Sequence, residues 1–181
     1  MDEKQLVRIS KFLSKYLRHE PESLGLTLAI GGWVKVDDLL AACRKKNFPI
    51  TKEQLKEVVE KNSKKRFSFD TTGAEIRANQ GHSIDVDLEL EPKPPPVVLY
   101  HGTAQKNLES IMTIGLQKMA RHHVHLSKDI TTATNVGARH GKPIVLAVDA
   151  EAMHKAGFTF YCSDNGVWLA DDVPAQYLKK I

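Results

Sequence analysis

The chain has 181 residues, of which 41% are hydrophobic and 27% are charged, and its formal net charge is +4. This composition is ordinary for a globular protein of one large or two small domains, and the mild positive charge permits a nucleic-acid partner without demanding one. No apolar run approaches the roughly 18 residues of a membrane span, and no signal-peptide core is present. Cys43 and Cys162 are the only cysteines and stand far apart, which argues against a disulfide framework or a zinc site and favours a reducing cytoplasm.

An apolar stripe predicts a helix near the start of the chain. Its members recur at helical spacing: Leu6, Ile9, Phe12, Leu13, Tyr16 and Leu17. A residue that precedes proline disfavours the helical conformation. Glu20-Pro21 therefore predicts that this helix ends near Arg18-His19.

Two more helices are predicted after a short strand. A Gly-Gly pair precedes Trp33-Val34-Lys35-Val36, which has the composition of a strand. Asp37 is a suitable N-cap for a helix that runs to about Lys46. Thr51 and Gln54 have the spacing of a capping box and predict the start of a third helix.

Two segments in which apolar and polar residues alternate flank Thr72-Gly73, and they predict a β-hairpin. A two-residue turn at this position places Phe69 opposite Ile76. It also places Arg66 opposite Asn79, on the polar side of the hairpin.

The order of these elements indicates a domain. Helix, short strand, two helices and hairpin is the order of a winged-helix module, so residues 1–91 are predicted to form a winged-helix lobe. That module often binds nucleic acid, but a fold alone does not establish function. Residues 92–96 contain four prolines, which favour extended geometry and predict a stiff linker.

After the linker the pattern changes to short strands and helices, which predicts a second, α+β lobe over residues 97–181. The first strand is expected to end at His101-Gly102-Thr103, and polar residues at strand ends are where ligand sites tend to form. Strands are expected at 97–100, 123–127, 144–148, 158–162 and 167–169, and helices around 107–114 and 131–139.

Three basic residues of the first lobe are candidates for binding an anion. Arg18 and His19 stand at a predicted helix C-terminus, where cations complement the helix dipole. A guanidinium beside an imidazole is also suited to clamping a phosphate, and the residues alone do not decide between these interpretations. Arg66 follows two lysines in a basic run, and strand alternation places it on the polar face of the hairpin.

The second lobe has two polar clusters. His101-Gly102-Thr103 offers donors for ribose or phosphate oxygens and a glycine that a ligand could approach, although the same residues would suit a simple turn. Arg121 precedes a histidine-rich segment in which His123 and His125 share a strand face. No carboxylate or cysteine completes a ligand set there, so no metal is expected. Neither a GxGxxG nor a Walker sequence is present.

Seven motifs in this order resemble the NAD-dependent RNA (tRNA) 2′-phosphotransferase family over nearly the whole chain. They are Leu17-Arg18-His19-Glu20-Pro21, Lys65-Arg66-Phe67, Arg77-Ala78-Asn79-Gln80-Gly81-His82-Ser83, His101-Gly102-Thr103, His123-Val124-His125-Leu126-Ser127, Val136-Gly137-Ala138-Arg139-His140-Gly141 and Gly166-Val167-Trp168-Leu169.

The resemblance implies a fold and a set of site residues. It implies a winged-helix RNA lobe joined by the proline-rich linker to an NAD-binding lobe of the ADP-ribosyltransferase fold. The catalytic set that it implies is Arg18, His19, Arg66 and Arg121. The NAD-binding set that it implies is His101, Gly102, Thr103, His125, Ser127, Arg139 and Val167, the last of which stands where many protein-modifying relatives carry a catalytic glutamate.

The resemblance also implies a reaction. An RNA 2′-phosphate attacks NAD to give a 2′-phospho-ADP-ribosylated intermediate, which then yields 2′-hydroxyl RNA and ADP-ribose 1″,2″-cyclic phosphate. The expected partners are 2′-phosphorylated RNA, such as a tRNA splicing product, and NAD, and a cytoplasmic monomer without metal is expected. Two alternatives are a one-step ADP-ribosyltransferase that acts on protein or nucleic-acid ends, and a noncatalytic winged-helix protein that senses NAD or ADP-ribose.

Overall fold

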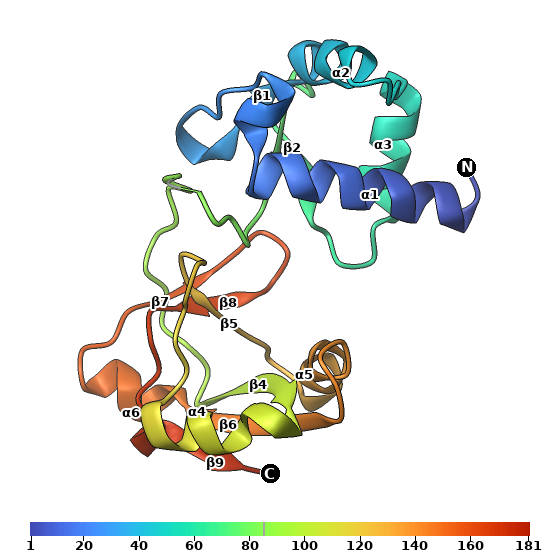
Figure 1. Ribbon diagram of the computed structural model, residues 1–181. Coiled ribbons are helices and arrows are strands. Elements are labelled where there is room, and N and C mark those ends of the chain that lie inside the picture. The colour runs from blue at the N-terminus through green and yellow to red at the C-terminus, as the bar shows by residue number, and fades with distance from the viewer. Residues whose placement is uncertain (85) are drawn as a thin grey trace. The chain divides into compact units, whose positions relative to one another are not determined.

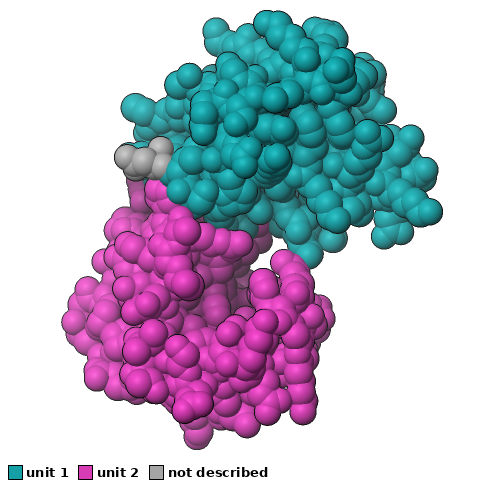
Figure 2. Space-filling model, in the orientation of Figure 1, with its two compact units in different colours: residues 1–89 teal, residues 90–181 magenta. Residues whose placement is uncertain are grey.

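The computed structural model describes residues 1–84 and 86–181, and the chain divides into two compact units, Met1–Glu89 and Leu90–Ile181 (Figure 2). Each unit combines helices with small antiparallel sheets, which confirms the predicted α+β class. Among the described residues, no helix is long and apolar enough to cross a membrane.

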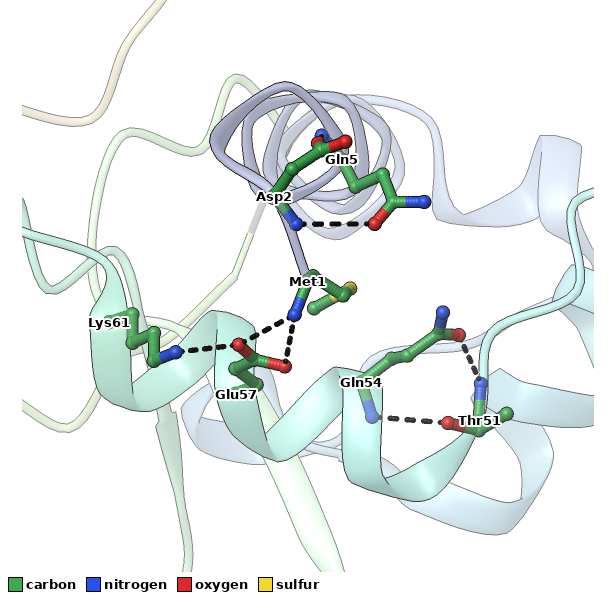
Figure 3. A network of polar contacts seen from close by, with 7 residues as sticks. All are labelled: Met1, Asp2, Gln5, Thr51, Gln54, Glu57 and Lys61. Atoms are coloured by element: carbon green, nitrogen blue, oxygen red, sulfur yellow. Dashed lines mark hydrogen bonds and ion pairs between the residues drawn. The ribbon is translucent and has the colours of Figure 1, made fainter.

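Helix α1 of the first unit extends from Glu3 to Arg18, so its predicted end is confirmed (Figure 1). Asp2 and Gln5 form a capping box at its start: the amide of Gln5 donates to Asp2 Oδ1 over 2.7 Å (Figure 3). Its buried side includes Leu13 and Leu17. The packing of this buried side positions the C-terminal end of the helix, where Arg18 is the last residue and His19 follows it.

The next elements are η1 (Pro21–Leu24), η2 (Ile30–Gly32), β1 (Val34–Lys35), α2 (Val36–Lys45) and α3 (Lys52–Lys61). The predicted capping box of α3 is confirmed, with Thr51 and Gln54 bonded to each other's amides (Figure 3). The predicted N-cap of α2 is wrong. Lys35 occupies the cap position. Asp37 lies in the first turn, where its negative charge interacts favourably with the positive end of the helix dipole.

A three-stranded sheet of order β1-β3-β2 completes the first unit, with β2 at Phe67–Phe69 and β3 at Glu75–Ala78. The predicted register is confirmed, since Phe69 pairs with Ile76. The turn is longer than the predicted two residues because the carboxylate of Asp70 accepts hydrogen bonds from the Thr72 hydroxyl and the Glu75 amide.

The second unit contains two three-stranded antiparallel sheets. One has the order β4-β6-β9, formed by Val98–Ala104, Pro143–Asp149 and Leu178–Lys180; the other has the order β5-β8-β7, formed by Val124–Leu126, Trp168–Ala170 and Phe160–Cys162. Backbone bonds between Tyr100 and Ser127 join β4 to the end of β5. Its helical segments are η3 (Gln105–Asn107), α4 (Leu108–Ile114), α5 (Ile130–Gly137), α6 (Ala150–Lys155) and η4 (Ala175–Tyr177), of which α6, like strand β9, was not predicted.

Strand β4 runs through Ala104 rather than ending at residues 101–103 as predicted. Helix α5 packs directly on it: a Cβ added to Gly102 would lie 1.6 Å from the carbonyl oxygen of Ala133. A Cβ on Gly137 would likewise lie 2.6 Å from the carbonyl oxygen of Thr103. The two glycines therefore let the backbones of helix and strand touch, which places α5 beside β4 (Figure 1).

The segment with four prolines is part of the second unit. The amide of Lys93 donates to the carbonyl of Phe160 over 2.8 Å, and its ammonium lies 5.7 Å from the centre of the Trp168 ring. The segment is thus attached to strands β7 and β8.

Candidate functional site

Arg18 and His19 lie at the C-terminus of α1, and both are bonded to Ser83. The Ser83 amide donates to the Arg18 carbonyl over 2.9 Å. The Ser83 hydroxyl lies 2.8 Å from Nδ1 of the His19 ring. Backbone and side chain of one serine therefore contact consecutive residues that were predicted to bind phosphate.

Arg66 directly precedes β2 and is held by Asn79. The Asn79 amide donates to the Arg66 carbonyl over 2.9 Å, and its side-chain Nδ2 donates to the Lys65 carbonyl over 2.7 Å. Lys65 has φ of +45°, a conformation that side-chain-bearing residues seldom adopt. The predicted pairing of Arg66 with Asn79 is confirmed by the first of these bonds.

The short segment from Asn79 to Ser83 thus bonds to all three residues: to the backbone carbonyls of Arg18 and Arg66 and to the His19 ring. Its middle is polar yet buried: Gln80 is 7% exposed and His82 is 1% exposed. No periodicity in the sequence points to this role, because the segment is neither a strand nor a helix. The segment could be recognised from the sequence only as one of the motifs shared with the family, and that motif did not indicate which residues it contacts.

Arg77 of the same motif has structural contacts. Its guanidinium carbon lies 4.6 Å from the centre of the Trp33 ring, and Nη1 donates to the Gly31 carbonyl over 3.2 Å. These bonds join β3 to the turn that precedes β1.

In the second unit, strand alternation places His101 and Thr103 on one face of β4 and Gly102 on the other. The His101 ring donates from Nδ1 to the carbonyl of His125 over 3.0 Å, since a carbonyl can only accept. In the neutral ring Nε2 is then an acceptor. Burial, which removes water from the charged ring, lowers the pKa of His101, and this outweighs the opposing effect of the carbonyl.

Thr103 and Gly102 have different surroundings. The Thr103 side chain is 6% exposed, and Asn107 Nδ2 lies 3.5 Å from its hydroxyl. Gly102 faces α5, and the close packing of this helix leaves no room for a side chain there.

Ser127 and Val167 occupy defined backbone positions. Ser127 exchanges two backbone hydrogen bonds with Tyr100, of 2.8 and 2.7 Å. Val167 precedes β8, and the buried Ser163 holds it: the Ser163 hydroxyl lies 3.2 Å from both the amide nitrogen and the carbonyl oxygen of Val167.

Arg121 and Arg139 are exposed residues of the second unit. The Arg121 amide donates to the Lys118 carbonyl over 3.0 Å, and the Lys118 amide donates to the carboxylate of Asp172 over 2.9 Å. The turn that carries Arg121 is therefore tied to the segment after β8. Arg139 follows the end of α5.

Over residues 1–84 and 86–181 no group of three or more histidine, cysteine or acidic side chains has the arrangement of a metal site. His123 instead packs its ring edge-on against Tyr161, with ring centres 5.4 Å apart. Burial lowers the pKa of His123, as it does for His101.

The chain resembles known proteins over its full length. The model of the family described as "RNA 2′-phosphotransferase, Tpt1 / KptA family" matches residues 4–172. A probable RNA 2′-phosphotransferase of Nostoc punctiforme is 65% identical over 100% of both chains. Proteins with the same description from Trichormus variabilis and Streptomyces griseus are 61% and 53% identical, each over 98% of both chains.

Proposed function

The chain belongs to the RNA 2′-phosphotransferase family, and we propose that it removes an internal 2′-phosphate from RNA by transferring it to NAD. The observation that carries this proposal is that residues 79–83 bond to the carbonyls of Arg18 and Arg66 and to the His19 ring. Two guanidinium groups and an imidazole within one unit suit a phosphate dianion, because arginine presents paired donors in a fixed plane.

We propose that the first unit is a winged-helix lobe that binds RNA. The order α1, β1, α2, α3 and the β2–β3 hairpin supports this assignment. The second unit is proposed to be an NAD-binding lobe of the ADP-ribosyltransferase kind. The proline-rich residues 92–96, which favour an extended backbone, lie in the second unit just after the boundary between Glu89 and Leu90.

In the proposed first step, an oxygen of the RNA 2′-phosphate bonds to C1″ of the NAD ribose as the bond to nicotinamide breaks. The products are 2′-phospho-ADP-ribosylated RNA and nicotinamide. A phosphate monoester is already anionic at pH 7, so this attack needs no general base. A hydrophobic residue such as Val167, held by Ser163, is compatible with that requirement.

In the proposed second step, the O2″ hydroxyl of the transferred ribose attacks the phosphorus and the RNA 2′-oxygen leaves with a proton. The products are 2′-hydroxyl RNA and ADP-ribose 1″,2″-cyclic phosphate. Negative charge grows on the phosphoryl oxygens, and Arg18, Arg66 and Arg121 are proposed to stabilise it. His19 is proposed to act there as a hydrogen-bond donor or general acid.

The structure of the second unit fits NAD at His101. Because Nδ1 is bonded to the His125 carbonyl, the neutral ring presents an acceptor at Nε2. The lowered pKa keeps the ring neutral at pH 7. An acceptor matches a ribose hydroxyl, which donates, and does not match a pyrophosphate oxygen. We therefore propose that His101 holds a ribose of NAD, with Thr103, His125, Ser127 and Arg139 as further contacts.

The decisive experiment mixes the purified chain with NAD and a 2′-phosphorylated oligonucleotide. Release of nicotinamide together with 2′-hydroxyl RNA is expected. A one-step ADP-ribosyltransferase would release nicotinamide but leave the phosphate on the RNA, and a noncatalytic sensor would release none. An oligonucleotide with a 2′-hydroxyl in place of the phosphate is the matched control and should yield no nicotinamide.

A further inference from the structure

We propose that Ser83 and Asn79 are positioning residues of this enzyme and that the segment between them sets the geometry of the phosphate site. The inference rests on the proposed function of Arg18, His19 and Arg66. It adds a role for a segment that touches the reacting groups only through those three residues.

Ser83 restrains the end of α1 at two points. Its amide bond to the Arg18 carbonyl, 2.9 Å long, holds the backbone where the helix ends. Its hydroxyl, 2.8 Å from His19 Nδ1, holds the imidazole in one orientation. A ring oriented in this way presents Nε2 in one direction, which is what a hydrogen-bond donor to a phosphate or a general acid requires.

Gly81 provides space for Arg18. It has φ of +88°, and a Cβ at this position would lie 3.4 Å from both Cζ and Nε of the Arg18 guanidinium. The backbone of Gly81 therefore forms a surface against which the guanidinium packs. Any larger residue would be strained and would crowd the side chain.

Asn79 restrains the residues before β2. Its two donors satisfy the carbonyls of Lys65 and Arg66, the residue with positive φ and the one that follows it. A residue keeps such a conformation only where its surroundings enforce it, and such residues cluster at functional sites. The side chain of Asn79, a residue that is 3% exposed, is one of the contacts that hold Lys65 here, together with the bond from the Lys65 amide to the Asn62 carbonyl.

The segment is buried although it is polar. Asn79, Gln80 and His82 are 3%, 7% and 1% exposed. A buried segment is held in place by its surroundings, so the residues that bond to it are held with it.

Ser83→Ala tests the inference, with Ser83→Thr as the conservative variant and Ser23→Ala as the control. Ser23 is exposed and has no role in the site. In the full-length protein, Ser83→Ala should lower kcat for 2′-hydroxyl RNA about tenfold and leave KM for NAD unchanged. Ser83→Thr retains the hydroxyl and should restore kcat to within about twofold, because the bond to His19 re-forms.

Nitrogen NMR of histidine-labelled protein gives a readout that a structural role would not change. The Nδ1 signal of the His19 ring, assigned with His19→Gln, should have the same chemical shift in the wild type and in Ser83→Thr. It should move in Ser83→Ala, which removes the hydrogen-bond partner of Nδ1. Equal kcat and equal His19 spectra in Ser83→Ala and Ser23→Ala would overturn the inference, as would equal impairment of the alanine and threonine variants. Failure of the proposed function would give a different result, because the wild-type protein itself would then release no 2′-hydroxyl RNA.

Discussion

The His101 ring donates from Nδ1 to the backbone carbonyl of His125, 3.0 Å away, and burial keeps this histidine neutral. One bond between two neighbouring strands thus determines which nitrogen of His101 faces a ligand. The burial of the same ring determines how the protein should respond to acid.

His101 should make the fold less stable as the pH falls. In the folded protein the pKa of His101 lies below the ordinary value of about 6.5. Under mildly acidic conditions His101 is therefore protonated more fully in the unfolded chain than in the folded protein. The free energy of unfolding of the wild type, minus that of His101→Gln, should therefore decrease from pH 7 to pH 5. Urea titrations at several pH values measure it. A difference that stays constant or increases toward pH 5 would contradict the assignment.

His101→Ala should slow the first chemical step. The variant removes the proposed acceptor for a ribose hydroxyl of NAD, so 2′-phospho-ADP-ribosylated RNA should form more slowly than in the wild type. Quenched-flow analysis of labelled 2′-phosphorylated RNA follows this species directly. Formation of the intermediate at the wild-type rate would show that His101 does not hold NAD.

Gly102→Ala should lower the free energy of unfolding because the new side chain clashes with α5, and not because the backbone loses conformational freedom. The new Cβ would lie 1.6 Å from the Ala133 carbonyl, so α5 must move, at a loss of at least about 3 kcal/mol. Gly157→Ala is the control: it has φ of +97° but no atom within 4 Å, so strain alone should cost about 1–2 kcal/mol. Urea denaturation compares the two, and equal losses would contradict the packing role.

Cys43 should resist alkylation in the folded protein. This residue of α2 is fully buried in the core of the first unit, and burial raises the pKa of its thiol to about 11. Iodoacetamide at pH 8 should label Cys43 only in denaturant, while the half-buried Cys162 provides an internal comparison by mass spectrometry. Rapid labelling of Cys43 without denaturant would mean that the first unit opens readily.

The sequence predicted those features that depend on neighbouring residues. The end of α1 followed from Pro21, the start of α3 from Thr51 and Gln54, and the hairpin register from alternation. Strand β4 was predicted too short because its glycine resembled a strand end. The glycine is instead required by Ala133, which is distant in the sequence and contacts β4 only after folding.

The candidate site likewise depends on contacts between residues that are distant in the sequence. Arg18, His19 and Arg66 were recognised as residue types that bind anions, and the structure places them about one segment. The role of Ser83 was not predicted, because a serine that bonds to a helix end 64 residues away has no local pattern. Such contacts are visible only when both partners have been placed in space.

Arg18, Arg66 and Arg121 are proposed to stabilise the second step, in which negative charge grows on the phosphoryl oxygens. Loss of one such donor typically slows a reaction about 10²–10³-fold, or roughly 3–4 kcal/mol. The first step demands less, since its developing charge is cationic at C1″. Arg66→Lys should also be impaired, because lysine keeps the charge but lacks the planar pair of donors.

A time course of radiolabelled 2′-phosphorylated RNA with NAD, resolved on a gel beside a nicotinamide assay, tests this claim most directly. Arg18→Ala, Arg66→Lys and Arg121→Ala should accumulate 2′-phospho-ADP-ribosylated RNA while nicotinamide is still released. Arg44→Ala, an exposed arginine of α2, should behave as the wild type. If the three variants bind RNA and NAD normally yet convert substrate to 2′-hydroxyl RNA without a trapped intermediate, the arginines do not act in the second step.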